Sequence, residues 1–158
     1  NEILLVPSVI TPQEEKALKD IGIKYAIIDT INTALGNNLI VNENYFFYLP
    51  ELEEKAVTTI SEALNIKGEA LELKDWEVIG SIVVINSKGG LIQKDVPEEI
   101  KKHIEEKLKI PLEEGTINFG SHVLGGGICV NKFGMVVGNQ SAGIEITNAD
   151  MAFGFLEK

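Results

Sequence analysis

Arginine is absent from this chain, and its absence limits what the protein can bind. All 14 basic residues are lysines, against 24 acidic residues, so the formal net charge is −10. Arginine grips phosphate through two parallel hydrogen bonds, whereas lysine offers only a point charge. An acidic chain without arginine is poorly suited to binding nucleic acid along its length and better suited to a basic protein surface. Acidity can also serve solubility alone.

Cysteine and long apolar runs are scarce as well. Cys129 is the only cysteine, which excludes an intrachain disulfide and a cysteine-rich zinc site. No apolar run is long enough to cross a bilayer, and the first residues lack the basic region and cleavage site of a signal peptide. We therefore expect a cytoplasmic protein with no membrane contact, no metal and no cofactor. Its 158 residues suffice for a sizeable core.

What the sequence does contain is internal repetition with a period of about 44 residues. Three times, a glycine is followed by a short apolar strand and then an asparagine. The strands occupy residues 39–41, 83–85 and 128–130. Asparagine can hydrogen-bond its own backbone, which suits a turn after each strand. The three turn asparagines are Asn42, Asn86 and Asn131.

Apolar residues between the strands recur at steps of 43 and 44 residues. One such set is Ala17, Ile60 and Ile104, and the next is Ile21, Leu64 and Leu108. In the third unit the apolar residues repeat every four positions, which indicates one face of a helix. Residues 11–14 combine an N-cap threonine, a proline and a capping-box glutamate, and residues 95–98 are expected to begin a helix in the same way.

Each unit is thus expected to run strand, turn, strand, helix, strand. A unit of this kind cannot bury its apolar face alone, so neighbouring units must cover one another. We expect an α/β fold in one repeat-built domain over residues 1–158. A partial repeat covers 1–31, and further repeats cover about 32–75, 76–119 and 120–158. Because the first unit lacks its beginning, we expect the natural chain to start before residue 1.

Four segments, in this order, resemble the archaeal and eukaryotic initiation factor six family. They are Asn-Thr-Ala-Leu-Gly-Asn at 32–37, Asn-Ser-Lys-Gly-Gly-Leu-Ile at 86–92, Glu-Gly-Thr-Ile-Asn with a following Gly-Ser at 114–121, and Gly-Gly-Ile-Cys-Val-Asn at 126–131. The resemblance implies a pentein-type β/α propeller of five pseudo-symmetric units, of which this chain would hold about three and a half. A chain that stops soon after the terminal helix is similar to the archaeal members.

The resemblance further implies binding to the large ribosomal subunit, chiefly to ribosomal protein L14, which prevents association with the small subunit. It implies a monomer, limited direct contact with ribosomal RNA, a role in ribosome biogenesis and no enzymatic activity. It implies structural repeat glycines at Gly36, Gly80 and Gly125. The residues after them would form the ribosome-binding rim, which comprises Asn37, Ser81 and Gly126. Asn37 could instead be only a turn residue.

Three positions depart from the family pattern and leave open whether docking is altered. Gln93 is followed by lysine where many relatives carry His-Pro, and Phe119 stands where relatives often carry a basic residue. Asn139 begins a segment that replaces an Asp-Thr-Thr type sequence. A pentein-derived remnant that no longer binds ribosomes is a further alternative.

A second class of function is enzymatic, because penteins include enzymes that modify guanidino groups with a nucleophilic cysteine. Cys129 follows a run of glycines, and His122 is close in sequence. Such a pair requires hydrogen-bond reach and an accessible thiolate. Cys129 takes the repeat position of Ile40 and Val84, so we expect it to be a buried strand residue without a catalytic role.

Overall fold

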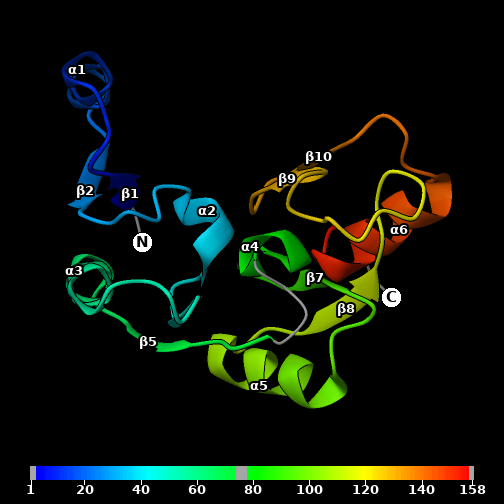
Figure 1. The fold of residues 1–158 in the computed structure, drawn as a ribbon. Coiled ribbons are helices and arrows are strands. Elements are labelled where there is room, and N and C mark those ends of the chain that lie inside the picture. The colour runs from blue at the N-terminus through cyan, green and yellow to red at the C-terminus, as the bar shows by residue number, and fades with distance from the viewer. Residues whose placement is uncertain (1–2, 74–77, 157–158) are drawn as a thin grey trace. The chain divides into compact units, whose positions relative to one another are not determined.

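A computed structural model describes residues 3–73 and 78–156 of the chain (Figure 1). The chain divides into two compact units, Asn1–Glu77 and Val78–Lys158, here called the first and the second unit. The predicted repeat boundary at residues 75 and 76 lies outside the described residues. A single repeat-built domain over the whole chain stays a prediction.

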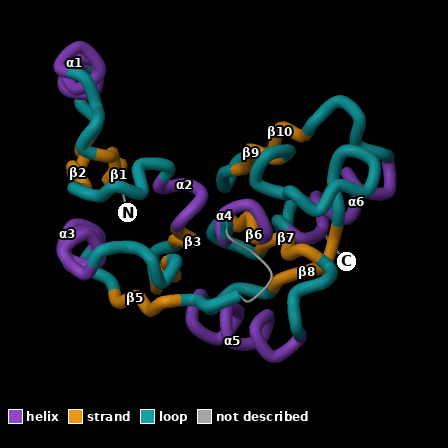
Figure 2. Tube along the Cα trace, viewed as in Figure 1, coloured by secondary structure: helices purple, strands orange, loops and turns teal. Residues whose placement is uncertain are grey.

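The first unit contains two small sheets and three helices (Figure 2). Its elements are β1 (Ile3–Pro7), α1 (Pro12–Asp20), β2 (Lys24–Ile28), α2 (Leu35–Asn38), β3 (Leu39–Val41), β4 (Tyr45–Tyr48), α3 (Glu54–Leu64) and β5 (Lys67–Ala70). Strands β1 and β2 are parallel and lie between α1 and α3. Strands β3 and β4 form an antiparallel hairpin, to which β5 adds in parallel.

The second unit repeats this arrangement and then begins it again. Its elements are α4 (Ile79–Ile82), β6 (Val83–Ile85), β7 (Gly90–Gln93), α5 (Glu98–Leu108), β8 (Leu112–Gly115), β9 (Ile128–Val130), β10 (Met135–Val137) and α6 (Gly143–Ala152). Strands β6 and β7 form an antiparallel hairpin, with β8 parallel to β7. Strands β9 and β10 form a third hairpin. The α/β class is confirmed, whereas a pentein-type propeller of repeats stays a prediction.

The asparagine after the first strand of each hairpin forms the turn as predicted. In all three hairpins its side-chain oxygen accepts hydrogen bonds from the backbone N–H groups two and three residues later, over 2.8 to 3.1 Å. Asn86 also makes a long-range bond, in which its Nδ2 donates to the carbonyl oxygen of Phe153 over 3.0 Å. The turn role of Asn42, Asn86 and Asn131 is therefore confirmed.

The two predicted helix starts have different outcomes. Thr11 and Glu14 form the predicted capping box at the start of α1. The expected start at residues 95–98 is wrong in its capping, because Pro97 is the N-cap of α5 and no side chain caps it. Asp95 precedes that cap by two residues, and its carboxylate instead lies 3.6 Å from Nδ1 of His122.

Each of two helices is enclosed between its own hairpin and the sheet that precedes it in sequence. Helix α3 contacts β1 and β2, and its fully buried Ile60 lies in one cluster with Ile28 and Phe46. Helix α6 contacts β7 and β8, and its Ala149 lies in one cluster with Leu91 and Ile128. Helix α3 therefore buries one face of the β1–β2 sheet, and α6 buries one face of the β6–β7–β8 sheet.

Candidate partner-binding rim

Two of the predicted rim positions lie at one backbone junction in the second unit. The backbone N–H of Gly125 donates to the carbonyl oxygen of Ser81 over 3.0 Å. A Cβ atom on Gly125 would lie 2.4 Å from the carbonyl oxygen of Gly80, so only glycine permits this approach. Gly126, next in the chain, is exposed. The structure thus brings Ser81 beside the turn that carries Gly126.

The third rim position, Asn37, lies on the short helix α2 of the first unit. It is exposed, and its backbone N–H donates to the carbonyl oxygen of Ala34 over 2.9 Å. A Cβ on the preceding Gly36 would meet no atom within 4 Å, in contrast to Gly125. The short helix therefore presents a compact amide to solvent, and the contact role of Asn37 stays a prediction.

A carboxylate holds the loop that leads to Asn37. Glu53 accepts hydrogen bonds from the hydroxyl of Thr30 and, over 3.0 Å, from the backbone N–H of Ile31. The bond from Thr30 and then that from Ile31 lower the pKa of Glu53. In this loop Ile31 is 88% exposed, so a large apolar residue lies in solvent.

A second carboxylate, Glu145, holds the loop after β8. It is buried, and it accepts hydrogen bonds from the backbone N–H groups of Ala142, Phe119 and Gly120 and from the hydroxyl of Thr116, over 2.8 to 3.0 Å. Burial by itself raises the pKa of this carboxyl group, but the four hydrogen bonds outweigh burial and lower the pKa to about 2. Glu145 is therefore a fixed negative charge at neutral pH.

Glu145 stabilises an uncommon backbone conformation. Asn118, Phe119 and Gly120 are three consecutive residues with positive φ, at 49°, 60° and 92°. Phenylalanine rarely adopts this conformation, yet Phe119 adopts it and is 85% exposed. Sequence reasoning missed Glu145, because its partner at the capping-box position is Ala142 rather than serine or threonine. The only signal in the sequence was the three-residue spacing between Ala142 and Glu145, which is the spacing of a capping box.

The three departures from the family pattern occupy different environments. Gln93 is buried at the end of β7, whereas Phe119 and Asn139 are exposed. A buried Gln93 contributes to packing within the second unit, and the two exposed residues are available to a partner. Their effect on docking stays a prediction.

The expectation that Cys129 is buried is wrong. Cys129 is exposed, although the matching Ile40 is buried and Val84 is partly buried. It lies in the β9–β10 hairpin opposite Val136, which is 73% exposed. Leu91 in the preceding hairpin lies in one buried cluster with Ile128 and Ala149, whereas Cys129 is exposed.

Exposure of Cys129 does not create a catalytic pair. His122 faces Asp95, and within residues 3–73 and 78–156 no hydrogen bond joins His122 to Cys129. Among the same described residues, no three acidic, histidine or cysteine side chains come close enough to hold a metal ion. No helix in the described part of the chain has the length and apolar character to span a membrane.

Comparison with known proteins identifies the family. The model of the eIF-6 family matches residues 1–152. Translation initiation factor 6 of Sulfolobus acidocaldarius is 31% identical over 97% of this chain and 70% of its own length. The proteins of the same name from Pyrobaculum aerophilum and Haloquadratum walsbyi are 28% and 29% identical, and the match covers 69% of each.

These relatives are named as translation initiation factors and not as enzymes, so the guanidino-modifying alternative based on Cys129 is not supported. The family match extends through both units and includes the Ser81–Gly126 junction. From its sequence and its named relatives, this chain belongs to the eIF-6 family.

Proposed function

We propose that this chain is a translation initiation factor that binds the large ribosomal subunit and prevents its association with the small subunit. The observation that carries the proposal is the family match over residues 1–152, together with relatives named translation initiation factor 6. The mechanism is steric occupancy of the subunit face, which needs no catalytic group. One copy binds one large subunit in the cytoplasm. The same binding has a role in ribosome biogenesis.

The charge of the chain supports a protein partner over an RNA partner. With a net charge of −10 and no arginine, the surface favours a basic ribosomal protein, which we propose to be L14, over the phosphate backbone. Direct contact with ribosomal RNA is therefore limited. Binding between an acidic and a basic surface should weaken as the salt concentration rises.

The rim is the proposed contact surface. Asn37 and Gly126 are exposed on tight backbone turns, and the Ser81 carbonyl fixes the turn before Gly126. Short side chains on fixed turns lose little conformational entropy when a partner orders them. The rim can thus approach a partner backbone closely.

Sucrose-gradient sedimentation with separated ribosomal subunits tests the proposal. The protein should migrate with the large subunit and reduce the amount of joined ribosomes when small subunits are added. Asn37→Lys should release it from the large subunit, whereas Gln13→Lys on α1, outside the rim, should not. Protein that stays at the top of the gradient would contradict the function. Normal binding of Asn37→Lys would contradict only the rim assignment.

A further inference from the structure

Two large apolar residues are held in solvent by hydrogen bonds of their own backbone. Among the large hydrophobic residues that the structure describes, Ile31 and Phe119 are the most exposed, at 88% and 85%. The backbone N–H of Ile31 donates to the carboxylate of Glu53 over 3.0 Å. The backbone N–H of Phe119 donates to the carboxylate of Glu145, also over 3.0 Å. The most exposed apolar residues are therefore fixed by charged side chains.

The two carboxylates hold their loops in the same way. Glu53 is the N-cap of α3, and Glu145 lies in the first turn of α6, so each begins the helix that comes after its loop. The hydroxyl groups of Thr30 and Thr116, which precede the exposed apolar residues in the chain, donate to the same two carboxylates. Hydrogen bonds to a charged acceptor are stronger than neutral ones, so both loops are firmly held.

Folding alone does not account for phenylalanine at position 119. The φ angle of Phe119 is 60°, a conformation that asparagine or glycine adopts at lower cost. Because the side chain is exposed, packing recovers little of that cost. Residues held in such conformations cluster at ligand clamps and other contact sites. An exposed aromatic ring on a fixed backbone is thus suited to contact with a partner.

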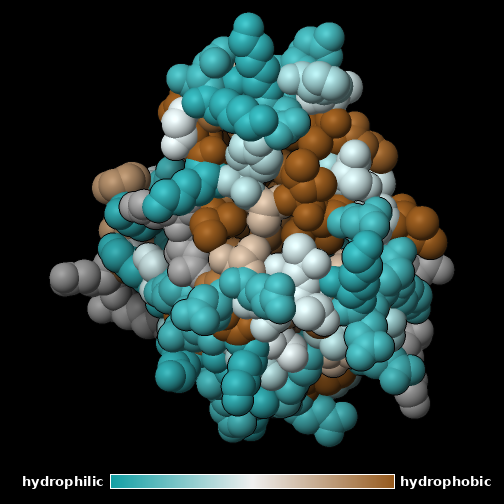
Figure 3. Space-filling model, turned by 90° about the vertical axis from the view of Figure 1, so that its left-hand side faces the viewer, coloured by the Kyte–Doolittle hydropathy of each residue, from teal (hydrophilic) through white to brown (hydrophobic). Residues whose placement is uncertain are grey.

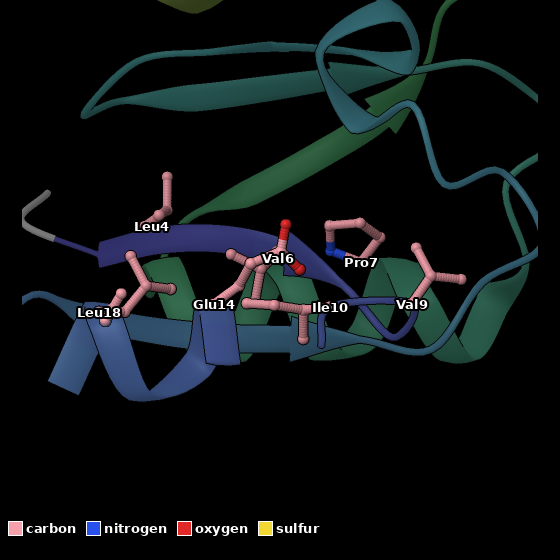
Figure 4. A pocket seen from close by; sticks show the side chains of 8 residues that line it. Leu4, Val6, Pro7, Val9, Ile10, Glu14 and Leu18 are labelled. Atoms are coloured by element: carbon pink, nitrogen blue, oxygen red, sulfur yellow. The ribbon is translucent and has the colours of Figure 1, made fainter. Parts of the chain in front are cut away.

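Exposure by itself does not mark a contact residue. Apolar residues lie among polar ones on the face shown in Figure 3, as on most protein surfaces. A groove between α1 and β1 is also lined mainly by apolar side chains, together with Glu14 (Figure 4). Glu14 accepts hydrogen bonds from Thr11 at the start of its own helix. The bond from the backbone to a carboxylate, and not exposure, distinguishes Ile31 and Phe119.

In the first unit, the exposed apolar residue lies beside a rim position. Nδ2 of Asn38 donates to the carbonyl oxygen of Asn32 over 3.1 Å. These two residues directly follow Asn37 and Ile31 in the chain. The hydrogen bond therefore places Ile31 and Asn37 on two backbone segments that are joined to each other.

The second unit contains a corresponding contact. A Cβ on Gly127 would lie 2.9 Å from Nδ2 of Asn118, so these two residues lie against each other. They are the chain neighbours of Gly126 and Phe119. The loop of Phe119 joins β8 to β9 and is held by α6, so the elements on both sides of it belong to the second unit. In each unit, then, the exposed apolar residue is next to a rim position.

We propose that Ile31 and Phe119 are apolar anchors through which the rim contacts its partner. Glu53 and Glu145 position these anchors. The inference rests on the proposed function, and the partner is the same basic protein surface of the large ribosomal subunit. Anchors that are fixed before binding lose little conformational entropy when the partner covers them. The net charge of −10 favours a protein surface in which basic groups surround the apolar contact.

The chemistry of the two anchors favours a protein over ribosomal RNA. Single-stranded nucleic acid is bound chiefly by stacking bases on aromatic rings and by basic groups along the backbone. Ile31 has no ring, and the acidic chain contains no arginine. An apolar recess in a protein accepts both an aliphatic and an aromatic side chain.

Titration with large ribosomal subunits, followed by sedimentation through a sucrose cushion, measures the dissociation constant of each variant. Phe119→Asn should raise it by at least about tenfold. Its midpoint of urea unfolding should be unchanged or higher, because asparagine suits the positive φ. Phe133→Asn is the matched control, since Phe133 is 83% exposed between β9 and β10, and should bind like the unchanged chain. Equal losses in both variants would overturn the inference.

Ile31→Asn tests the first unit and should also weaken binding. Phe119→Leu distinguishes a protein recess from a nucleotide base. Leucine keeps the apolar contact and gives up the ring, so this variant should lose less affinity than Phe119→Asn. A loss as large as that of Phe119→Asn would indicate base stacking and overturn the protein partner.

A double-mutant cycle, at a temperature at which all variants are folded, tests Glu145 as a positioning residue. Glu145→Gln should weaken binding of the chain that has Phe119 and have little further effect once Phe119→Asn is present. Equal weakening in both backgrounds would show a structural role only and overturn the positioning role. If the unchanged chain does not bind the large subunit, the proposed function fails and this inference with it. If it binds and Phe119→Asn binds as tightly, only this inference fails.

Discussion

The backbone N–H of Gly125 donates to the carbonyl oxygen of Ser81 over 3.0 Å, although the two residues are far apart in sequence. This bond joins the turn before β9 to the short helix α4 before β6. The space for a side chain at Gly125 is taken by the carbonyl oxygen of Gly80, at 2.4 Å from where a Cβ would be. The junction therefore requires glycine for its close backbone approach rather than for an unusual φ angle.

Gly125→Ala should lower the free energy of unfolding by about 1–3 kcal/mol, because the new methyl group must push two backbone segments apart. Gly36→Ala is the matched control, since nothing lies within 4 Å of its added Cβ. The control should be neutral or slightly stabilising. Urea denaturation of both variants measures the difference. Equal losses in the two variants would contradict the steric explanation.

Glu145→Gln should destabilise the protein near neutral pH and have less effect in acid. The pKa of Glu145 is lowered from 4.5 to about 2 in the folded chain, so its ionised form stabilises the fold above pH 4.5. This contribution, up to about 3 kcal/mol, is lost as the pH falls from about 4.5 to 2. Denaturation at several pH values measures it. Glu106→Gln, at an exposed position on α5, is the control and should show no such trend.

Asn86→Ala should cost more stability than Asn131→Ala. Both side chains close a hairpin turn, but buried Asn86 also donates to the carbonyl oxygen of Phe153 over 3.0 Å. Removing it leaves that buried acceptor unpaired, at a cost of about 1–3 kcal/mol beyond the turn. Thermal unfolding of the two variants gives the comparison. A larger loss for exposed Asn131 would contradict it.

Cys129→Ala should change the free energy of unfolding by less than about 0.5 kcal/mol, because the side chain is exposed. Leu91→Ala, which empties a fully buried site in the preceding hairpin, should cost about 2–5 kcal/mol. Chemical denaturation separates these values. Loss of a catalytic activity in the Cys129→Ala variant would revive the enzymatic alternative.

Local features of this fold could be predicted from the sequence because their partners are a few residues away. The asparagine turns depend on N–H groups two and three residues later, and the Thr11–Glu14 capping box depends on one turn of helix. The recurrence of apolar residues at steps of 43 and 44 residues also predicted correctly that Ile60 and Ile104 are buried in the core. The α/β class follows from these local elements.

The Glu145 network could not be predicted, because its hydrogen-bond partners at Thr116, Phe119 and Gly120 are 25 to 29 residues away. The exposure of two residues at repeat positions could not be predicted either. Ala17 takes the same repeat position as Ile60, and Cys129 takes that of Val84, yet Ala17 and Cys129 are both exposed.

By itself, then, the sequence determined the elements, the turns and the family resemblance, because these depend on local hydrogen bonding and periodicity. Only the tertiary structure decided which apolar faces are covered and which loop residues a buried carboxylate holds. The physical reason is that burial requires a second surface, and a residue's own sequence position does not say whether that surface is present.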